Sequence, residues 1–487
     1  MRKKPLFLFL LPIFFVLHGF MEYYDLITIR SAIKVLLLYI VAAYLIAWLT
    51  SFIFKNKYKA NLFTLFLLSV NFFFGPLYDF FDIILKSALL TKYAFLLPLV
   101  FLLLLFSIIW LKKIKQPSLK ITFFTNTVLI LLLITDSFFL IIKIYKQNNR
   151  NLASENSALI PAHVTDKPDI YFIVPDGYAG DVELKDVLQF DNNTFLQQLK
   201  DRGFHIIENS KSNYNWTIFS MASALNMSYL KIKDPKNIAP LLINGLRTVK
   251  HNRLFELLSR EGYKINNFSI FGAGNKSIPM EESVFPSDAS LLGGQTLLGH
   301  LIKIINYNIS NKLKWKSFAN RGIYAASRNN ENIYTSTWNF TEHHDSLPQF
   351  TYTHLLMPHS PYYYDKNGNP FPFEKLIDGN QTNKNLYVEY LQYANKKLIP
   401  LIDHILQESA KPPIIIIMSD HGWRRFPKGL AKNYQFINLA AIYLPEKNYS
   451  AFKDSMSNVN MFRVLLNTRF GQNLPMLKDS STYLERE

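Results

Sequence analysis

The sequence predicts a membrane protein of two parts: an N-terminal bundle of five transmembrane α-helices, then an extracytoplasmic α/β domain with a central, mostly parallel sheet. Three observations predict this class. Long apolar runs and most of the excess positive charge both lie in the first 150 of the 487 residues. The remainder contains short, wholly apolar runs, which are typical of strands buried on both faces of a sheet. The length also indicates more than one domain, because single cores stop growing at about 250–300 residues.

The five apolar runs each approach the ~20 residues that cross a bilayer as a helix. They cover residues 5–21, 32–54, 60–80, 92–111 and 121–142. The third run is the weakest, because it contains Asn71, Gly75, Pro76 and Asp79. The first run follows three cations, but no small-residue cleavage site comes after it, so we interpret it as a retained helix and not as a signal peptide.

Charge predicts the orientation of these spans. The chain has a net charge of +17, and residues 1–150 hold 17 Lys and Arg but only five acidic residues. With five spans, the loops on one side contain ten cations and no acid: Arg2, Lys3, Lys4, Lys55, Lys57, Lys59, Lys112, Lys113, Lys115 and Lys120. The loops on the other side, residues 21–31 and 81–91, hold Arg30 and Lys86 against three acids. The positive-inside rule then places the N-terminus in the cytoplasm and the C-terminal domain in the periplasm or outside the cell; a sixth span would reverse this.

The expected boundaries follow from composition. We expect a transmembrane domain over residues 1–145, a polar Asn- and Ser-rich linker over 146–168, and one catalytic domain over 169–487. The last part is only mildly basic, which excludes nucleic acid as a partner. The chain has no cysteine, which excludes disulfides, thiolate zinc sites and thiol nucleophiles.

Three apolar runs of the α/β domain each end in polar residues. Residues 169–174 precede Pro175-Asp176-Gly177, residues 350–357 precede Pro358-His359-Ser360-Pro361, and residues 414–418 precede Ser419-Asp420-His421-Gly422. The carboxyl ends of parallel strands meet at one edge of a sheet, so we expect Asp176, Asp420 and His421 to converge there. Two carboxylates and an imidazole suit a divalent cation: the oxygens favour magnesium or manganese, and the histidine leaves zinc open. Taken singly, each motif is commonly structural, since Asp-Gly is usually a turn.

A fourth segment supplies a hydroxyl group. Apolar residues recur at helical spacing from Ile218 to Leu225, which places Thr217 in the first turn of a helix behind Asn-rich capping residues. A hydroxyl at that position lies in the positive field of the helix dipole, and a metal beside it would favour the alkoxide. Such an alkoxide could attack phosphorus or sulfur in line; the ordinary alternative is a simple N-cap threonine.

Together, these segments resemble the alkaline-phosphatase superfamily, and within it the membrane-bound sulfatase-like branch that includes lipoteichoic acid synthases and phosphoethanolamine transferases. That branch shares the plan of five transmembrane helices, a linker and an extracytoplasmic α/β domain. The resemblance implies one divalent metal ion (Mn, Mg or Zn) bound by Asp176, Thr217, Asp420 and His421, with Thr217 as the nucleophile.

The resemblance also implies roles around the substrate. His359, in His359-Ser360-Pro361-Tyr362, matches the histidine that contacts the substrate phosphate in the family. His354 and Arg424 lie near the same strand ends, where they would either hold anionic oxygens or serve structural roles.

Departures from the family pattern narrow the expected function. Lipoteichoic acid synthases usually have Glu where this chain has Asp176. Sulfatases make formylglycine from Cys or Ser in a Cys/Ser-x-Pro-x-Arg motif, which the segment around Thr217 lacks. Phosphoethanolamine transferases of this group typically carry disulfides, and none can form here.

We therefore expect metal-dependent phosphotransfer. Thr217 would take a phospho-alcohol group from a membrane phospholipid and release diacylglycerol, and an acceptor hydroxyl from a glycan, a lipid or water would resolve the phospho-enzyme. His359 would protonate the leaving group or hold an oxygen. The alternatives are a membrane-anchored phosphodiesterase or phosphatase, a sulfuric-ester-hydrolase-like enzyme, and an inactive sulfatase-like binding protein.

Overall fold

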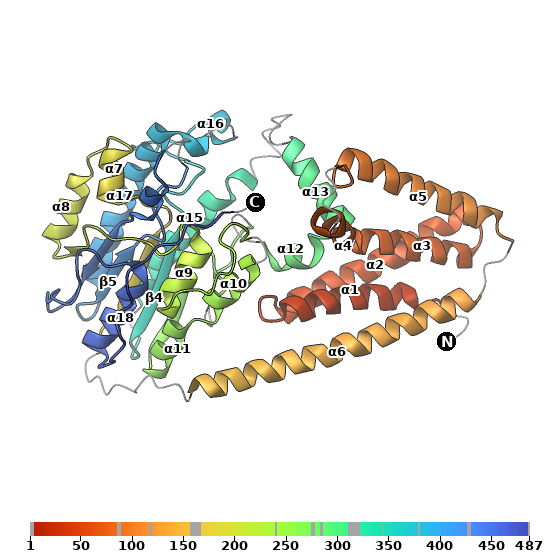
Figure 1. The fold of residues 1–487 in the computed structure, drawn as a ribbon, viewed down its shortest axis with the longest axis horizontal. Coiled ribbons are helices and arrows are strands. Elements are labelled where there is room, and N and C mark those ends of the chain that lie inside the picture. The colour runs from red at the N-terminus through yellow and green to blue at the C-terminus, as the bar shows by residue number, and fades with distance from the viewer. Residues whose placement is uncertain are drawn as a thin grey trace. The chain divides into compact units, whose positions relative to one another are not determined.

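The computed structural model describes residues 4–84, 89–115, 119–155, 167–238, 241–273, 278–282, 286–309, 322–343, 345–377, 380–425 and 430–485. Three of the cations used to predict the orientation lie outside these ranges: Arg2, Lys3 and Lys86. The chain divides into two units (Figure 1). The first contains Met1–Ser157 and Pro286–Leu313, and the second contains Ala158–Phe285 and Lys314–Glu487. The grouping of Pro286–Leu313 with the N-terminal helices differs from the uninterrupted domain expected over 169–487.

All five apolar runs are helical. They form α1 (Phe7–Tyr23), α2 (Ile29–Phe54), α3 (Lys57–Phe72) continued by α4 (Phe74–Asp79) and a π-helical turn (Phe80–Ile84), α5 (Tyr93–Lys113), and α6 (Leu119–Glu155). Among the described residues, three helices are long and apolar enough to cross a membrane: α2, α5 and residues 119–146 of α6. The pair α3 and α4 is a fourth candidate, bent by 53°, and α1 is shorter, at 17 residues. The break falls at Phe73, between the two helices. Pro76, four residues after Phe72, has no N–H to donate to the carbonyl oxygen of Phe72, and its ring crowds that oxygen.

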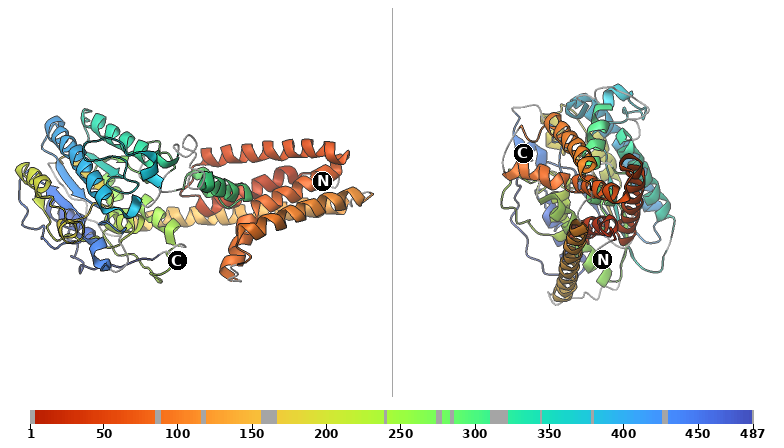
Figure 2. Two further views of the ribbon diagram at one scale, coloured as in Figure 1. Left: turned by 90° about the horizontal axis from the view of Figure 1, so that it is seen from above. Right: turned by 90° about the vertical axis from the view of Figure 1, so that its right-hand side faces the viewer.

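Helices α1, α2, α3 and α6 pack side by side around small and aromatic residues (Figure 2). Ala43, Ala60 and Phe72 are fully buried in this core. Asp136 of α6 faces α1, as expected for an acid within an apolar run, and its Oδ2 lies 3.1 Å from Nδ1 of His18. The helix α6 continues to Glu155, so the first ten residues of the expected linker are helical. Residues 156–166 lie outside the described part of the chain.

The cation-rich segments of the first unit meet at one end of it. Lys59, in the first turn of α3, donates from Nζ to the carbonyl oxygen of Ile114, just after α5 (2.6 Å). Asn126, near the start of α6, donates to the carbonyl oxygen of Lys4, just before α1 (3.0 Å). Three connections that the sequence assigns to one side of a membrane therefore lie together.

The second unit is built on a six-stranded sheet in the order β2-β6-β5-β1-β4-β3. The strands are β1 (Ile170–Pro175), β2 (His205–Ile206), β3 (Lys264–Phe268), β4 (Gln349–Leu355), β5 (Ile414–Met418) and β6 (Ala440–Tyr443). The strand β1 pairs in parallel with both β4 and β5, and β6 runs antiparallel to its two neighbours. The predicted α/β class is confirmed, with a mixed sheet in which one strand opposes the others.

Helices cover both faces of this sheet (Figures 1 and 2). One face packs against α9 (Thr217–Asn226), α10 (Leu242–Lys250), α11 (Arg253–Arg260) and α18 (Asn458–Arg469). The other packs against α7 (Asp181–Asp186), α8 (Asn193–Asp201), α15 (Ala325–Thr341) and α17 (Lys384–Glu408). Successive residues of β1 alternate between the two cores, so Phe172 lies in the first and Ile173 in the second. A strand buried on both faces must be apolar throughout, which explains the uninterrupted runs of the sequence.

Candidate active site

The three strands predicted from the sequence are neighbours at the centre of the sheet, in the order β5-β1-β4. Asp176 follows β1 directly, and its backbone N–H donates to the carbonyl oxygen of Leu355 at the end of β4 (2.8 Å). Asp420 and His421 follow β5. Ligand atoms of Asp176, Asp420 and His421 all lie within 4.8 Å of one another, and none of the three residues is more than 1% exposed. The expected convergence at the carboxyl edge of the sheet is therefore present.

Two carboxylate oxygens in this cluster have no hydrogen-bond donor. Oδ1 of Asp420 accepts from the N–H of Gly177 (2.8 Å), but its Oδ2 and Oδ1 of Asp176 accept from none of the described residues. Burial alone would raise the pKa of Asp176, but three neighbouring histidines hold it below its usual range, so the group is ionised. Buried anionic oxygens that lack donors need a cation. The donor set of two carboxylates and one imidazole therefore fits a divalent metal ion.

His421 presents a free lone pair to the same point. Its Nδ1 lies 2.7 Å from the carbonyl oxygen of Gly422, which can only accept, so Nδ1 carries the proton. Burial lowers the pKa of this ring, which keeps it neutral and leaves Nε2 unprotonated. Nε2 lies 3.2 Å from Oδ2 of Asp420 and 3.3 Å from Oγ1 of Thr217. This is the tautomer that a metal ligand requires.

Thr217 begins α9, as the helical spacing predicts, and its side chain is buried at 5% exposure. Ser220, three residues later on the same helix, donates from Oγ to the carbonyl oxygen of Asp420 (2.5 Å) and so ties α9 to the loop after β5. The expected capping by asparagines is wrong. The N-cap residue is Trp216, which makes no side-chain cap bond, and Asn215 instead hydrogen-bonds the backbone of Leu484.

His354 lies behind Asp176 in the interior of β4. Its ring is fully buried, Nδ1 faces the hydroxyl of Tyr352 at 2.7 Å, and Nε2 lies 3.4 Å from Oδ2 of Asp176. A tyrosine hydroxyl donating to Nδ1 leaves the proton on Nε2, directed at the carboxylate. This geometry favours the structural alternative, in which His354 orients Asp176, over contact with a substrate oxygen.

His359 and Arg424 lie together at the mouth of the site. Nδ1 of His359 is 2.6 Å from the carbonyl oxygen of Ser360 and is therefore protonated, while Nε2 accepts from Nη2 of Arg424 (3.2 Å). Burial lowers the pKa of His359 to about 4, and the charge of Arg424 adds to this effect. Arg424 also donates to the carbonyl oxygen of Asn215 (3.1 Å), and its guanidinium lies 5.0 Å from the ring of Trp216. Arg424 is thus the fixed cation of the site, and neutral His359 orients it.

Sequence reasoning missed Glu183 of α7. This carboxyl is fully buried, and its Oε2 accepts from the N–H of Trp423 (3.0 Å). It also closes over Gly422, where an added Cβ would lie 2.2 Å from Oε2. Burial raises the pKa of Glu183 well above its usual value. No pattern around Glu183 distinguishes it from an ordinary surface acid of a short helix, so only tertiary structure identifies it as a support of the Asp420-His421 loop.

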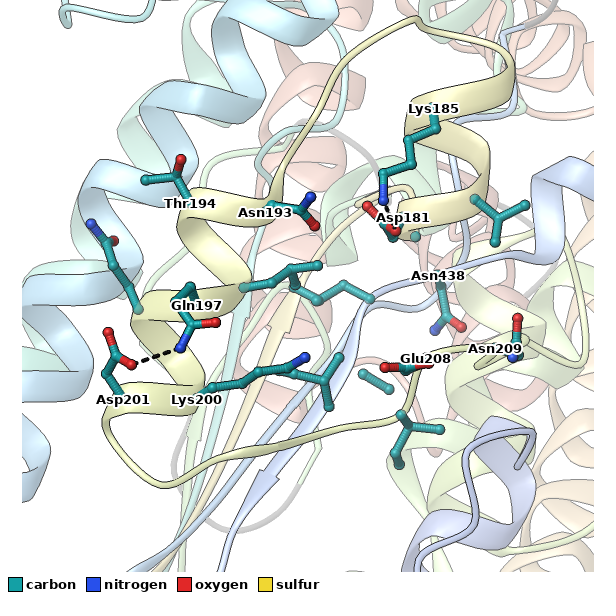
Figure 3. Close-up of a pocket in the computed structure, with 18 residues that line it drawn as sticks. Asp181, Lys185, Asn193, Thr194, Gln197, Lys200, Asp201, Glu208, Asn209 and Asn438 are labelled. Carbon is teal, nitrogen blue, oxygen red and sulfur yellow. Dashed lines mark hydrogen bonds and ion pairs between the residues drawn. The ribbon is translucent and has the colours of Figure 1, made fainter.

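The cavity at this site is narrow and lies between the loops after β1, β4 and β5. Its lining includes His359, His421, Arg424 and Arg425. A larger cavity of about 920 Å³ lies elsewhere, between α7 and α8, and contains none of the predicted site residues (Figure 3). Two of its carboxylates have local donors: Asp181 accepts from Lys185 (2.7 Å) and Asp201 accepts from the amide of Gln197 (2.8 Å). Of these two cavities, the narrow one is the one lined by predicted site residues, namely His359, His421 and Arg424.

The chain is similar to a family model and to several solved structures. A family model described as Sulfatase matches residues 189–464. No curated protein matches the chain. Solved structures similar to it include the C-terminal periplasmic domain of EcEptC from Escherichia coli, with 13% identity and a TM-score of 0.41 over 67% of this chain and 94% of that one.

Two further similar structures cover slightly less of this chain. The periplasmic domain of the phosphoethanolamine transferase EptC from Campylobacter jejuni has 16% identity and a TM-score of 0.38 over 63% of this chain and 90% of that one. BT1596, a 2-O GAG sulfatase, has 12% identity and a TM-score of 0.38 over 66% and 73%. The family model spans more than half of the chain and includes the loop that carries Asp420 and His421. The chain therefore belongs to the sulfatase family.

Proposed function

We propose that this protein is a metal-dependent phosphotransferase that moves a phospholipid-derived phospho-alcohol group to an acceptor hydroxyl through a phosphorylated Thr217. One observation carries the proposal: Oγ1 of Thr217 lies 3.3 Å from the unprotonated Nε2 of His421, beside two buried carboxylate oxygens that lack donors. A hydroxyl that shares a cation site with two carboxylates is placed to act as an alkoxide.

The residues of the chain divide the work of the first step. Asp176, Asp420, His421 and Thr217 would hold one divalent ion, which supplies positive charge that lowers the pKa of a coordinated hydroxyl. Oγ1 of Thr217 gives up its proton to water and forms a bond to phosphorus. The bond from phosphorus to the diacylglycerol oxygen breaks, and water protonates the released diacylglycerol. Arg424 donates hydrogen bonds to the non-bridging oxygens as their charge grows, which is the main source of catalysis in phosphoryl transfer.

The hydrogen bonds of His359 favour a role in positioning Arg424. Both of its nitrogens are already committed, one as a donor to Ser360 and the other as an acceptor from Arg424. A pKa of about 4 leaves the ring neutral at physiological pH, so it is a poor general acid in this geometry. We therefore favour the role of positioning Arg424 over protonation of the leaving group.

The second step returns Thr217 to its free form. The hydroxyl of a glycan, a lipid or water loses its proton and attacks phosphorus on the side opposite Oγ1. The bond from phosphorus to Oγ1 breaks, and Oγ1 takes up a proton. Water as the acceptor would make the protein a phosphodiesterase or phosphatase. Sulfate-ester hydrolysis through formylglycine is disfavoured, because the residue at this position is a threonine and the chain lacks cysteine.

We also propose five membrane crossings, an N-terminus in the cytoplasm and the α/β domain on the periplasmic or outer side. Five helical segments and the meeting of the cation-rich connections at one end of the first unit support this arrangement. A domain held at the outer surface of a membrane finds its phospholipid donors nearby, which favours a lipid substrate.

Mass spectrometry of the full-length protein in detergent tests the chemistry. We would incubate it with phosphatidylglycerol and separately with phosphatidylethanolamine, in the presence of manganese, and digest it. We expect a peptide containing Thr217 with an added mass of glycerol phosphate or ethanolamine phosphate, whichever lipid is the donor.

Thr217→Ala and Thr217→Ser are the matched variants for this experiment. We expect alanine to abolish the adduct and to lower turnover at least ~10³-fold, because no other group can form the intermediate. Serine should retain it in part. An adduct that forms normally in Thr217→Ala would overturn the nucleophile assignment, and bare phosphate in place of a phospho-alcohol would favour a phosphatase. Absence of turnover and adduct with every lipid and with soluble phosphoesters would favour a binding protein.

A further inference from the structure

The segment Pro286–Leu313 interrupts the α/β domain in sequence but groups with the N-terminal helices. It contains α12 (Asp288–Gly293) and α13 (Leu297–Tyr307), which lie against α1, α2, α3 and α4 (Figures 1 and 2). Leu292 of α12 is buried among Val16, Ile27 and Ala32. An added Cβ on Gly19 of α1 would lie 2.9 Å from Leu292, so the two helices approach closely.

Hydrogen bonds fix this segment to the ends and breaks of the membrane helices. Oδ2 of Asp288 accepts from the backbone N–H and from the hydroxyl of Thr28, the N-cap of α2 (3.1 and 3.0 Å). At the break between α3 and α4, the carbonyl oxygen of Gln295 accepts from the N–H of Gly75 (2.8 Å). Oδ1 of Asn71 in turn accepts from the N–H of Leu298 in the first turn of α13 (3.1 Å). The break and the helix therefore satisfy each other's free backbone groups.

The two faces of α13 differ. Leu297 packs with Phe74, Leu96 and Val100 of the first unit. On the other side, Leu298, Ile302 and Ile305 are 55%, 49% and 49% exposed. Their spacing of four and then three residues places them on one stripe of the helix. An apolar stripe on a helix whose opposite face is already docked needs a covering medium.

Aromatic and polar side chains surround α13 where it contacts the N-terminal helices. Nδ1 of His300 on α13 lies 2.7 Å from the hydroxyl of Tyr93 at the start of α5, and both rings contact Tyr78. Tyrosines of this kind gather where the hydrocarbon core meets the headgroups. This end of the helices is also opposite to the end where the cation-rich connections meet.

We propose that α13 is an interfacial helix, with Leu298, Ile302 and Ile305 buried in the lipid at the boundary between headgroups and acyl chains. Lipid is the occupant because the helices that α13 contacts also expose large apolar side chains, including Leu77 of α4 and Phe95 and Leu99 of α5, as helices surrounded by lipid do. At 11 residues, the helix is too short to cross a bilayer. Helices that lie in the interface bury their apolar face about 5–10 Å into the boundary between headgroups and acyl chains. The proposal is independent of the proposed chemistry.

The absence of cysteine makes a direct test simple, because each introduced cysteine is the only one in the chain. We would label Leu298→Cys, Ile302→Cys and Ile305→Cys in the full-length protein with a nitroxide and reconstitute each in phosphatidylethanolamine and phosphatidylglycerol vesicles. Electron paramagnetic resonance then compares collisions with oxygen, which concentrates in lipid, and with a water-soluble nickel chelate. The controls are Lys303→Cys, at an exposed position of α13 that is not part of the stripe, and Lys200→Cys, at an exposed position of α8.

We expect the ratio of oxygen to nickel collisions at the three stripe positions to exceed that at Lys200 several-fold, with Lys303 between them. Nickel accessibility at the stripe equal to that at Lys200 would overturn the proposal. Low access to both reagents, together with a distance signal between labels on two chains, would overturn it as well and assign the stripe to a second copy of this chain.

Discussion

The carboxyl group of Glu183 is buried behind the loop that carries Asp420 and His421. Its protonation should therefore make the free energy of unfolding depend on pH. The unfolded chain titrates this group near its ordinary pKa of about 4.3. In the folded state burial raises the pKa well above that value. Between the two values the folded protein binds more protons than the unfolded chain, so the stability that the proton supplies is complete below the unfolded pKa and falls as pH rises through the folded pKa.

Glu183→Gln removes this titration and keeps an acceptor for the N–H of Trp423. We expect the melting temperature of the full-length protein in detergent, followed by tryptophan fluorescence, to fall less in Glu183→Gln than in the wild type as the pH rises above the unfolded pKa of about 4.3. The exposed Glu208→Gln is the control and should behave as the wild type. Identical pH dependence in Glu183→Gln and the wild type would contradict a raised pKa.

Asp420 lets a metal site be tested without disturbing the loop. Asp420→Asn keeps an oxygen that accepts from the N–H of Gly177 but removes the charge of the unpartnered oxygen. We expect elemental analysis of the purified full-length wild type to find close to one divalent ion per chain and Asp420→Asn to lose it. The exposed Asp234→Asn should retain the ion. A wild type that stays metal-free after manganese, magnesium and zinc are supplied would remove the proposed mechanism.

At the scale of elements, the segment before α9 is held by a stretch of chain more than 250 residues away. Asn215 bonds Leu484 twice, through its Nδ2 to the carbonyl oxygen (3.1 Å) and through its Oδ1 from the N–H (2.9 Å). The backbone carbonyl of Asn213 accepts from the N–H of Thr482 (2.9 Å). Residues 482–484 thus fix the backbone that places Thr217 beside His421.

Asn215→Ala should loosen that backbone. The substitution leaves the buried N–H of Leu484 without a partner, at about 1–3 kcal/mol, while the carbonyl oxygen keeps the bond from Nε1 of Trp216 (3.0 Å). We therefore expect the melting temperature to fall by a few degrees. Because Thr217 would be less well placed, turnover should fall roughly 10- to 100-fold while the metal content stays unchanged. The exposed Asn193→Ala is the control. Normal turnover in a destabilised Asn215→Ala protein would show that the contact serves stability alone.

At the scale of the whole molecule, the orientation in the membrane remains a prediction from charge. A bacterial alkaline phosphatase fused after Glu487 should be active, because that enzyme matures only outside the cytoplasm, and the same reporter fused after Lys113 should be inactive. Fluorescent-protein fusions at the two positions should give the opposite pattern. A fusion after Glu487 that is active only as the fluorescent protein would overturn the five-span topology.

The elements that could be predicted from the sequence are those in which nearly every consecutive residue is buried in protein or lipid. Every residue of a membrane-spanning run, or of a strand buried on both faces such as Ile414–Met418, is surrounded by apolar groups and is therefore itself apolar. Such a run can be recognised from the sequence alone. The same logic placed Asp176, Asp420 and His421, since parallel strands must end at one edge. The strand β3 was missed because Asn266 and Asn267 make it look polar, although Asn266 donates to Gln349 and Asn267 to the carbonyl oxygen of Phe271.

The sequence by itself determined the α/β class, the five helical segments and the side chains that could hold a cation. Tertiary structure decided the rest: that His354 lies behind Asp176 and faces its carboxylate, that Glu183 supports the loop after β5, and that α13 belongs with the N-terminal helices. The physical reason is the same in each case. A periodic pattern records whether a residue is buried, but the identity of the group that covers it depends on chain segments far away in sequence.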